Sequence, residues 1–191
     1  MVDRAIVVNI TLFLEAALLL IGVGWIELAQ LNLYDQFFLT PKLFAIGVIS
    51  GLTLASSSFV IFFLGKLAND KIEWITRLRQ IVNEELAPLF SGLRITDIFL
   101  IALSSGFCEE VFFRGILQTE TNLLTASVVF GLVHLPNIKY LPYGLWAFAA
   151  GVFFGLLIQA TGSIYVPMLA HGMSNFISIC YMRYCVKPVA V

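Results

Sequence analysis

Long apolar stretches divide this chain into segments. A helix that spans a membrane needs about 20 mostly apolar residues. Six stretches reach or approach that length: residues 5–28, 43–64, 98–117, 123–135, 143–160 and 164–181. The pattern therefore predicts an all-α fold, a polytopic membrane bundle of about six transmembrane helices. We expect residues 1–191 to form a single membrane domain, and we expect the first stretch to be retained, because it is longer than a signal-peptide core and lacks a small-residue cleavage pattern.

One long polar stretch, residues 66–97, separates the second and third apolar stretches. Apolar residues recur there at helical spacing, with charged residues on much of the opposite face; they are Ile72, Ile75, Leu78, Val82 and Leu86. This spacing predicts an amphipathic surface helix. Two interpretations remain open, a helix lying on the membrane surface and a connecting helix that caps the bundle. Pro88 and Gly92 are expected to end it, with Thr96 and Asp97 as the N-cap of the next helix.

Composition supports a membrane protein. Apolar and aromatic residues make up 60% of the chain and charged residues 12%, against about 25% charged in soluble domains. The net charge is -1 and there is no basic stripe, so no nucleic-acid partner is expected.

The distribution of cations predicts an orientation. Five cations lie in the polar stretch: Lys66, Lys71, Arg77, Arg79 and Arg94. The positive-inside rule places this stretch in the cytoplasm, and six helices then bring Arg4, Lys139, Arg183 and Lys187 to the same side and Lys42 to the other. Both termini are thus expected in the cytoplasm. A compact domain with short loops is typical of prokaryotes, so the expected location is a bacterial plasma (inner) membrane.

Three ionisable residues lie inside the third apolar stretch. Each Asp, Lys or Arg at the centre of a membrane helix costs about 2.5–3.5 kcal/mol on insertion scales. Glu110 and Arg114 are four residues apart, on one helix face and in the favourable order for an ion pair. Glu109 points about 100° away and has no local partner, so it is a candidate proton acceptor.

The two histidines also lie in apolar stretches. His171 and Asn175 are four residues apart and share a helix face, where two donors can meet at one point, as an oxyanion hole requires. His134 ends the fourth stretch. Gly131 and Gly172 are expected to let neighbouring helices approach closely. Any one polar residue can simply hold helices together, but these types together favour acid–base and oxyanion chemistry.

Three motifs in this order resemble those of the CAAX protease and bacteriocin-processing family (CPBP or Abi, the Rce1-type membrane endopeptidases). They are Glu109-Glu110-x-x-x-Arg114, Phe130-x-x-x-His134 and His171-x-x-x-Asn175. Phe113 to Gly115, Gly131 and the run from Ser163 to Pro167 agree with the same pattern. The resemblance covers residues 84–183, the expected catalytic region, and the first two stretches match nothing specific.

The resemblance implies an intramembrane endopeptidase that is glutamate-dependent. It implies that Glu109 and His134 activate water, that His171 and Asn175 hold the oxyanion, and that Glu110, Arg114 and Phe130 support the site. No cofactor and no metal are expected. The expected partners are membrane lipid and a peptide or membrane-protein substrate. Eukaryotic members act on prenylated C-termini, whereas bacteria generally lack such proteins, so secreted peptides or membrane regulators are expected as substrates at least as much as prenylated proteins.

Other functions remain open from the sequence. A zinc metalloprotease could use the same His and Glu residues, although the HExxH spacing is absent. Cys108 could act as a nucleophile, but its neighbour Glu109 points elsewhere and a packing role is preferred. A non-catalytic immunity or scaffold protein could use the polar cluster for docking, and its effect would survive a change at Glu109.

Overall fold

The computed structural model describes residues 3–67 and 71–186, and these are helical with no strand. The element bounds are α1 Arg4–Ala29, η1 Tyr34–Gln36, α2 Pro41–Leu67, α3 Glu73–Gln80, η2 Ile81–Leu86, α4 Ala87–Phe90, α5 Ile95–Glu110, η3 Val111–Leu117, α6 Gln118–Glu120, α7 Leu123–Val133, η4 Ile138–Tyr140, α8 Leu141–Thr161 and α9 Tyr165–Tyr184. The predicted all-α class is confirmed, and each of the six apolar stretches falls on a helix.

Three described helices are long and apolar enough to cross a membrane, Arg4–Ala29, Pro41–Leu67 and Ile138–Thr161. The pair Glu73–Phe90 and Ile95–Glu120, bent by 116°, gives a fourth if it is one span. Helix α7 has only 11 residues, about 16 Å at 1.5 Å per residue. The six expected helices are thus present and roughly consistent with the prediction, but by length and composition only three of these described helices, or four with the bent pair, qualify as membrane spans. Helix α7 is too short to cross alone, and α9 is not among the qualifying helices.

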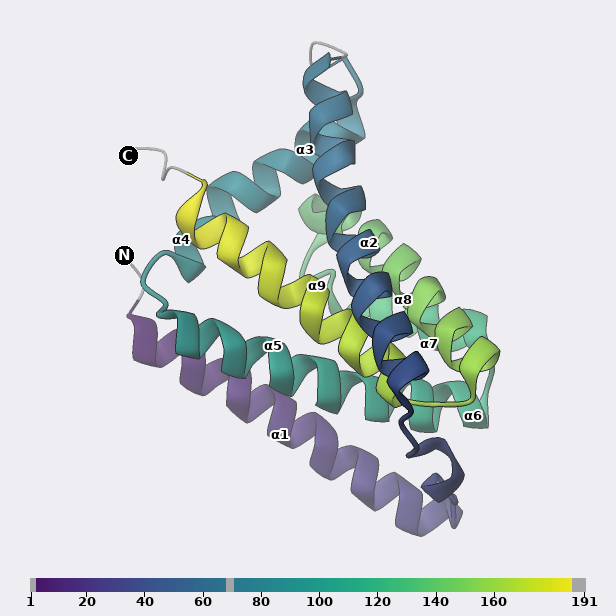
Figure 1. The fold of residues 1–191 in the computed structure, drawn as a ribbon. Coiled ribbons are helices and arrows are strands. Elements are labelled where there is room, and N and C mark those ends of the chain that lie inside the picture. The colour runs from purple at the N-terminus through teal and green to yellow at the C-terminus, as the bar shows by residue number, and fades with distance from the viewer. Residues whose placement is uncertain (1–2, 68–70, 187–191) are drawn as a thin grey trace.

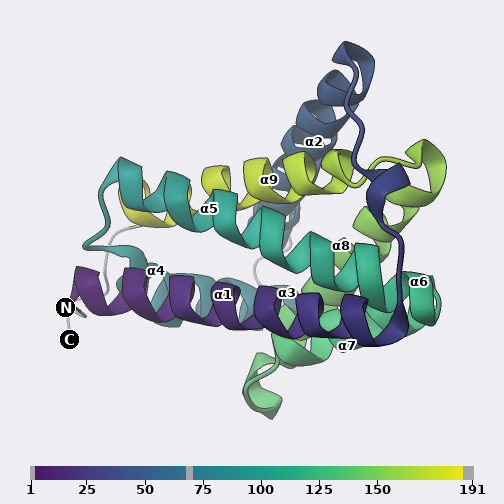
Figure 2. The same cartoon turned by 90° about the horizontal axis from the view of Figure 1, so that it is seen from below.

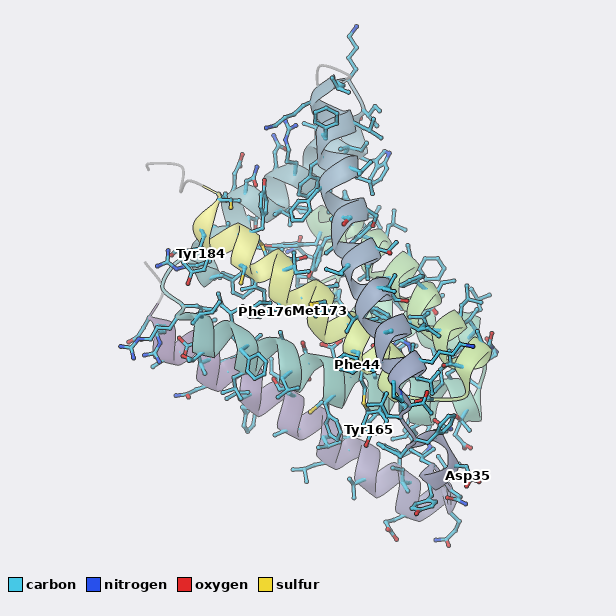
Figure 3. The ribbon with its side chains drawn as sticks, viewed as in Figure 1. Asp35, Phe44, Tyr165, Met173, Phe176 and Tyr184 are labelled. Carbon is cyan, nitrogen blue, oxygen red and sulfur yellow. The ribbon has the colours of Figure 1, made fainter. Side chains whose placement is uncertain are left out.

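Helix α9 lies at the centre of the bundle. It passes between α2 and α5 (Figure 1), with Met173 facing α2 at Gly51 and Phe176 facing α5 at Phe99. Figure 3 labels both side chains along α9. Helix α1 lies beside α5 in both views of the ribbon (Figures 1 and 2). Helices α5 and α9, which carry predicted site residues, are therefore packed directly against each other.

The amphipathic helix packs on the bundle. Helices α3, η2 and α4 follow one another without a gap over Glu73–Phe90. The side chains of Ile75 and Leu78 on its apolar face are buried, and α3 contacts α2 and α8. The capping interpretation is thus the one that the structure favours. The helix continues through Pro88, which lies where the π-helical segment η2 passes into α4, and it ends at Phe90, two residues before Gly92.

The next helix begins slightly earlier than expected. Arg94 is the N-cap of α5, and the Asp97 carboxylate at the third helical position accepts from the Arg94 backbone N–H at 2.7 Å. The predicted N-cap at Thr96 and Asp97 was therefore wrong by two to three residues. The same carboxylate binds the Arg4 guanidinium, with N–O distances of 2.6 and 3.0 Å, which joins the start of α1 to the start of α5.

Contacts at the ends of the helices show which cationic residues lie at the same end of the bundle. Arg4 pairs with Asp97, the Arg183 guanidinium donates to the Leu93 carbonyl, and Tyr140, next to Lys139, contacts Glu85. At the opposite end the backbone of Gln36 accepts from Ile164 N–H. The start of α1, the end of α9 and the polar stretch thus share one end. That this end faces the cytoplasm stays a prediction, and Lys187 lies outside the described residues.

Candidate active site

The paired glutamates end helix α5, where the helix widens into the π-helical segment η3. Their carboxylates point in different directions, as their spacing predicted. The Glu110 side chain is fully buried, whereas Glu109 lines a cavity of about 280 Å³. Single π turns inside α-helices are frequent at functional sites, and nothing in the apolar pattern indicated this one.

Glu110 is held by two partners. Its Oε2 lies 3.2 Å from Nε of Arg114, and its Oε1 lies 2.8 Å from Nδ1 of His171. The Arg114 guanidinium also donates to the Gly151 carbonyl at 3.2 Å and lies 4.5 Å from the centre of the Phe130 ring. The predicted Glu110–Arg114 pair is therefore confirmed. The contact between Glu110 and His171 was not predicted, and it ties α5 to α9.

Glu109 meets His134 across a helical hairpin. Oε2 of Glu109 lies 3.9 Å from Nε2 of His134. The chain turns at Thr121 and Asn122, and Glu109 lies 12 residues before Thr121 while His134 lies 12 residues after Asn122. Residues equally far from the turn of an antiparallel hairpin lie at the same level. The equal distance of Glu109 and His134 from the turn was therefore the feature of the sequence that could have predicted their contact.

The His134 ring has a defined tautomer when neutral. Its Nδ1 lies 2.8 Å from the Phe130 carbonyl oxygen. A carbonyl oxygen only accepts hydrogen bonds, so Nδ1 carries the hydrogen and Nε2 is left as an acceptor. The acceptor nitrogen is thus the one that lies near Glu109, and the backbone of the same helix orients it.

His171 and Asn175 line the same cavity from α9. The His171 ring stacks on Phe154, with 4.8 Å between ring centres and 16° between planes. Nδ2 of Asn175 donates to Oγ of Ser105 at 2.9 Å, which leaves its second N–H for another acceptor. The predicted shared face is confirmed, and each side chain is held by a partner on α5.

Glycines bring these helices together. A Cβ at Gly131 would lie 2.9 Å from the Gly144 carbonyl oxygen, and one at Gly172 would lie 3.2 Å from the Ala102 carbonyl oxygen. Real Cβ atoms rarely approach so closely. The close approach predicted at both glycines is confirmed, between α7 and α8 and between α9 and α5.

Several polar residues that line the cavity were missed by the sequence reasoning, among them Glu15, Ser105 and Tyr143. Glu15 lies in the middle of α1, and its carboxyl is within hydrogen-bonding reach of Glu109. A carboxylate at the centre of the first apolar stretch was the available signal. Ser105 and Tyr143 are common residue types in membrane helices and carried no comparable signal.

The other candidate chemistries find less support in the geometry. Cys108 is a buried free cysteine that does not line the cavity. Within residues 3–67 and 71–186, no three His, Cys, Asp or Glu side chains are grouped as a metal site would require.

Comparison with known proteins identifies the second half of the chain. Residues 91–177 match the family model described as Type II CAAX prenyl endopeptidase Rce1-like. This stretch is similar to the Rce1-like family. It lies inside the region 84–183 predicted from the motifs, and it contains Glu109, His134, His171 and Asn175. The match and the apolar helices together support an integral membrane protein.

A curated relative was found in Bacillus subtilis (strain 168). The uncharacterized protein YpbD is 33% identical over 96 residues, which are 50% of this chain and 51% of the relative. The chain thus spans about half the length of the curated relative that it matches. No solved structure matches. The roles of individual residues in the Rce1-like region therefore stay predictions.

Proposed function

We propose that this chain is an intramembrane glutamate-dependent endopeptidase of the CAAX-processing type. The observation that carries the proposal is the convergence of Glu109, His134, His171 and Asn175, from three helices, on one cavity in a Rce1-like region. The single membrane domain, with residues 84–183 as its catalytic region, is part of the proposal.

Glu109 and His134 are suited to activate water. Their facing atoms are 3.9 Å apart, which is longer than a direct hydrogen bond but short enough for one water to donate to both. Both atoms are acceptors, so they orient the water oxygen toward a substrate carbonyl. Glu109 takes the proton as the oxygen attacks and returns it to the leaving amine.

His171 and Asn175 are suited to stabilise the tetrahedral intermediate. Asn175 offers its second amide N–H. Nδ1 of His171 faces Glu110, so Nε2 is the ring nitrogen that can donate a hydrogen bond to an oxyanion. A protonated ring carries a hydrogen on both nitrogens and can make both contacts. Glu110, Arg114 and Phe130 hold the ring and the helices in place.

The proposed substrate is a peptide or membrane protein whose scissile bond enters the cavity from the membrane, with or without a prenyl group. Aromatic and aliphatic side chains line much of the cavity, among them Phe59, Phe62 and Phe90. The proposed location is a bacterial plasma membrane with both termini in the cytoplasm.

The test is cleavage of a pool of quenched peptides, including farnesylated CAAX peptides, by the purified protein in detergent. We expect the wild type to cleave and Glu109→Gln to lose activity by about 100-fold or more, the usual contribution of a general base. Glu120→Gln is the matched control, because Glu120 follows on the same continuous helix and is exposed. It should cleave like the wild type.

The same assay separates the alternatives. Loss of cleavage with a chelator, restored by zinc, would replace this mechanism with that of a zinc metalloprotease. Equal cleavage by Glu109→Gln would end the proposed role of Glu109. A cellular effect that persists in Glu109→Gln, with no cleavage by the wild type, would indicate a non-catalytic immunity or scaffold protein.

A further inference from the structure

Glu15 is a buried carboxyl group that the proposed mechanism does not use. It lies in the interior of α1, flanked by Leu14 and Ala16. It is only 9% exposed, and Gly22 is the only other buried residue described in α1, although the helix has 26 residues. A carboxyl group placed inward at the middle of an apolar helix is costly unless a partner stabilises it.

The partner of Glu15 is Glu109. Their carboxyl groups are within hydrogen-bonding reach and both line the cavity. Oε2 of each glutamate is buried and accepts no hydrogen bond from any donor in the described part of the chain. Two carboxylates cannot donate to each other, so the contact needs a proton on one of them.

The surroundings favour a single shared proton. The titratable groups that face the pair are Cys108 on α5, His134 at the end of α7 and Tyr143 on α8. None of them carries a permanent positive charge. The guanidinium of Arg114, whose charge also acts on Glu109, is paired with the Glu110 carboxylate. Two adjacent like charges in an apolar site are strongly disfavoured, so one of the two groups holds a proton.

We propose that Glu15 and Glu109 share one proton, the neutral Glu15 carboxyl donating a hydrogen bond to the ionised Glu109 carboxylate, and that Glu15 thereby positions the general base. The pairing itself is independent of any activity, whereas the positioning role rests on the proposed protease function. The bond fixes the Glu109 carboxylate while leaving it one negative charge with which to take a proton from water.

The pairing is tested by infrared spectroscopy of the purified protein at neutral pH. The C=O stretching band of a protonated carboxyl group is separate from the bands of carboxylates, and its frequency shifts when the proton is exchanged for deuterium. We expect this absorption in the wild type, its loss in Glu15→Gln, whose amide needs no shared proton, and its retention in Glu27→Gln. Glu27 is the matched control because it is an exposed glutamate on the same helix. No such absorption in the wild type, or full absorption in Glu15→Gln, would overturn the pairing.

A second measurement uses the wild type alone, in case Glu15→Gln does not fold by circular dichroism. Hydrophobic carbodiimides modify protonated carboxyl groups in apolar sites. Peptide mass spectrometry is expected to find the adduct on Glu15 or Glu109 and not on Glu27. An adduct on neither member of the pair would contradict the shared proton.

The positioning role is tested by kinetics. Glu15→Gln keeps a donor and should retain a kcat close to that of the wild type. Glu15→Leu removes the donor and should lower kcat by up to about 100-fold, the effect of a small displacement of a reacting group, with KM unchanged. A folded Glu15→Leu with wild-type kcat would overturn the positioning role. If the wild type cleaves nothing, the protease proposal fails, and the infrared and carbodiimide results still decide the pairing.

Discussion

At the scale of single residues, burial separates two Glu–Arg pairs of identical spacing. In the Glu110–Arg114 pair both side chains are fully buried, whereas in Glu73–Arg77 they are 78% and 62% exposed. Removing one partner of a buried pair leaves an uncompensated charge, at about 3–5 kcal/mol, while exposed pairs contribute little. We therefore expect Arg114→Met to lower the free energy of unfolding by that amount and Arg77→Met to leave it unchanged, both measured by chemical denaturation in detergent. Equal effects would show that Glu110 does not depend on Arg114.

Residue spacing predicted much of the candidate site. The different directions of Glu109 and Glu110, the Glu110–Arg114 pair and the shared face of His171 and Asn175 follow from helical geometry alone. The contact of Glu110 with His171, and that of Glu109 with Glu15, join residues far apart in the chain. Helical spacing does not report which distant helices become neighbours, so these contacts needed the folded chain.

At the scale of elements, close helix packing depends on glycines whose neighbours are backbone atoms. A Cβ at Gly106 on α5 would lie 2.8 Å from both the Gly172 nitrogen and the Met168 carbonyl oxygen of α9. Backbone atoms inside a helix cannot move aside as side chains do. We expect Gly106→Ala to lower the free energy of unfolding by about 1–3 kcal/mol, as overpacked substitutions do, and to lower the thermal unfolding midpoint in detergent.

Gly24→Ala is the control for this prediction. Gly24 lies inside helix α1, and a Cβ there would have no atom within 4 Å. Alanine favours helices over glycine by up to about 1 kcal/mol, so this variant should be as stable as the wild type or slightly more stable. Similar losses in both variants would mean that the α5–α9 contact does not explain the effect.

The apolar pattern predicted the ends of every long helix to within about three residues, because a long uninterrupted apolar stretch is easily recognised in a sequence. It did not predict the π-helical segments η2 and η3, since a π turn leaves the apolar pattern unbroken. The start of α5 was misplaced because Asp97, a residue type common at N-caps, here accepts from the helix start while sitting three residues inside it.

At the scale of the whole molecule, the cationic segments gather at one end of the bundle. We predict that this end faces the cytoplasm. After Cys108, Cys180 and Cys185 are replaced by Ser, Lys139→Cys should react with a membrane-impermeant maleimide only in permeabilised bacterial cells. Lys42→Cys should react in cells whose plasma membrane is intact and whose outer layer has been made permeable to the maleimide. The reverse pattern would invert the orientation.

The origin of the site residues also has a consequence for biogenesis. Glu15, Glu109 and His134 lie on helices that are synthesised before α9, and the hairpin turn at Thr121 and Asn122 sets the register of Glu109 against His134. His171 and Asn175 arrive with α9, which follows every other element of the site in the chain. During N-to-C synthesis, the residues proposed to activate water are therefore in place before those proposed to hold the oxyanion. Under the proposed function, a nascent chain stays inactive until helix α9 is inserted.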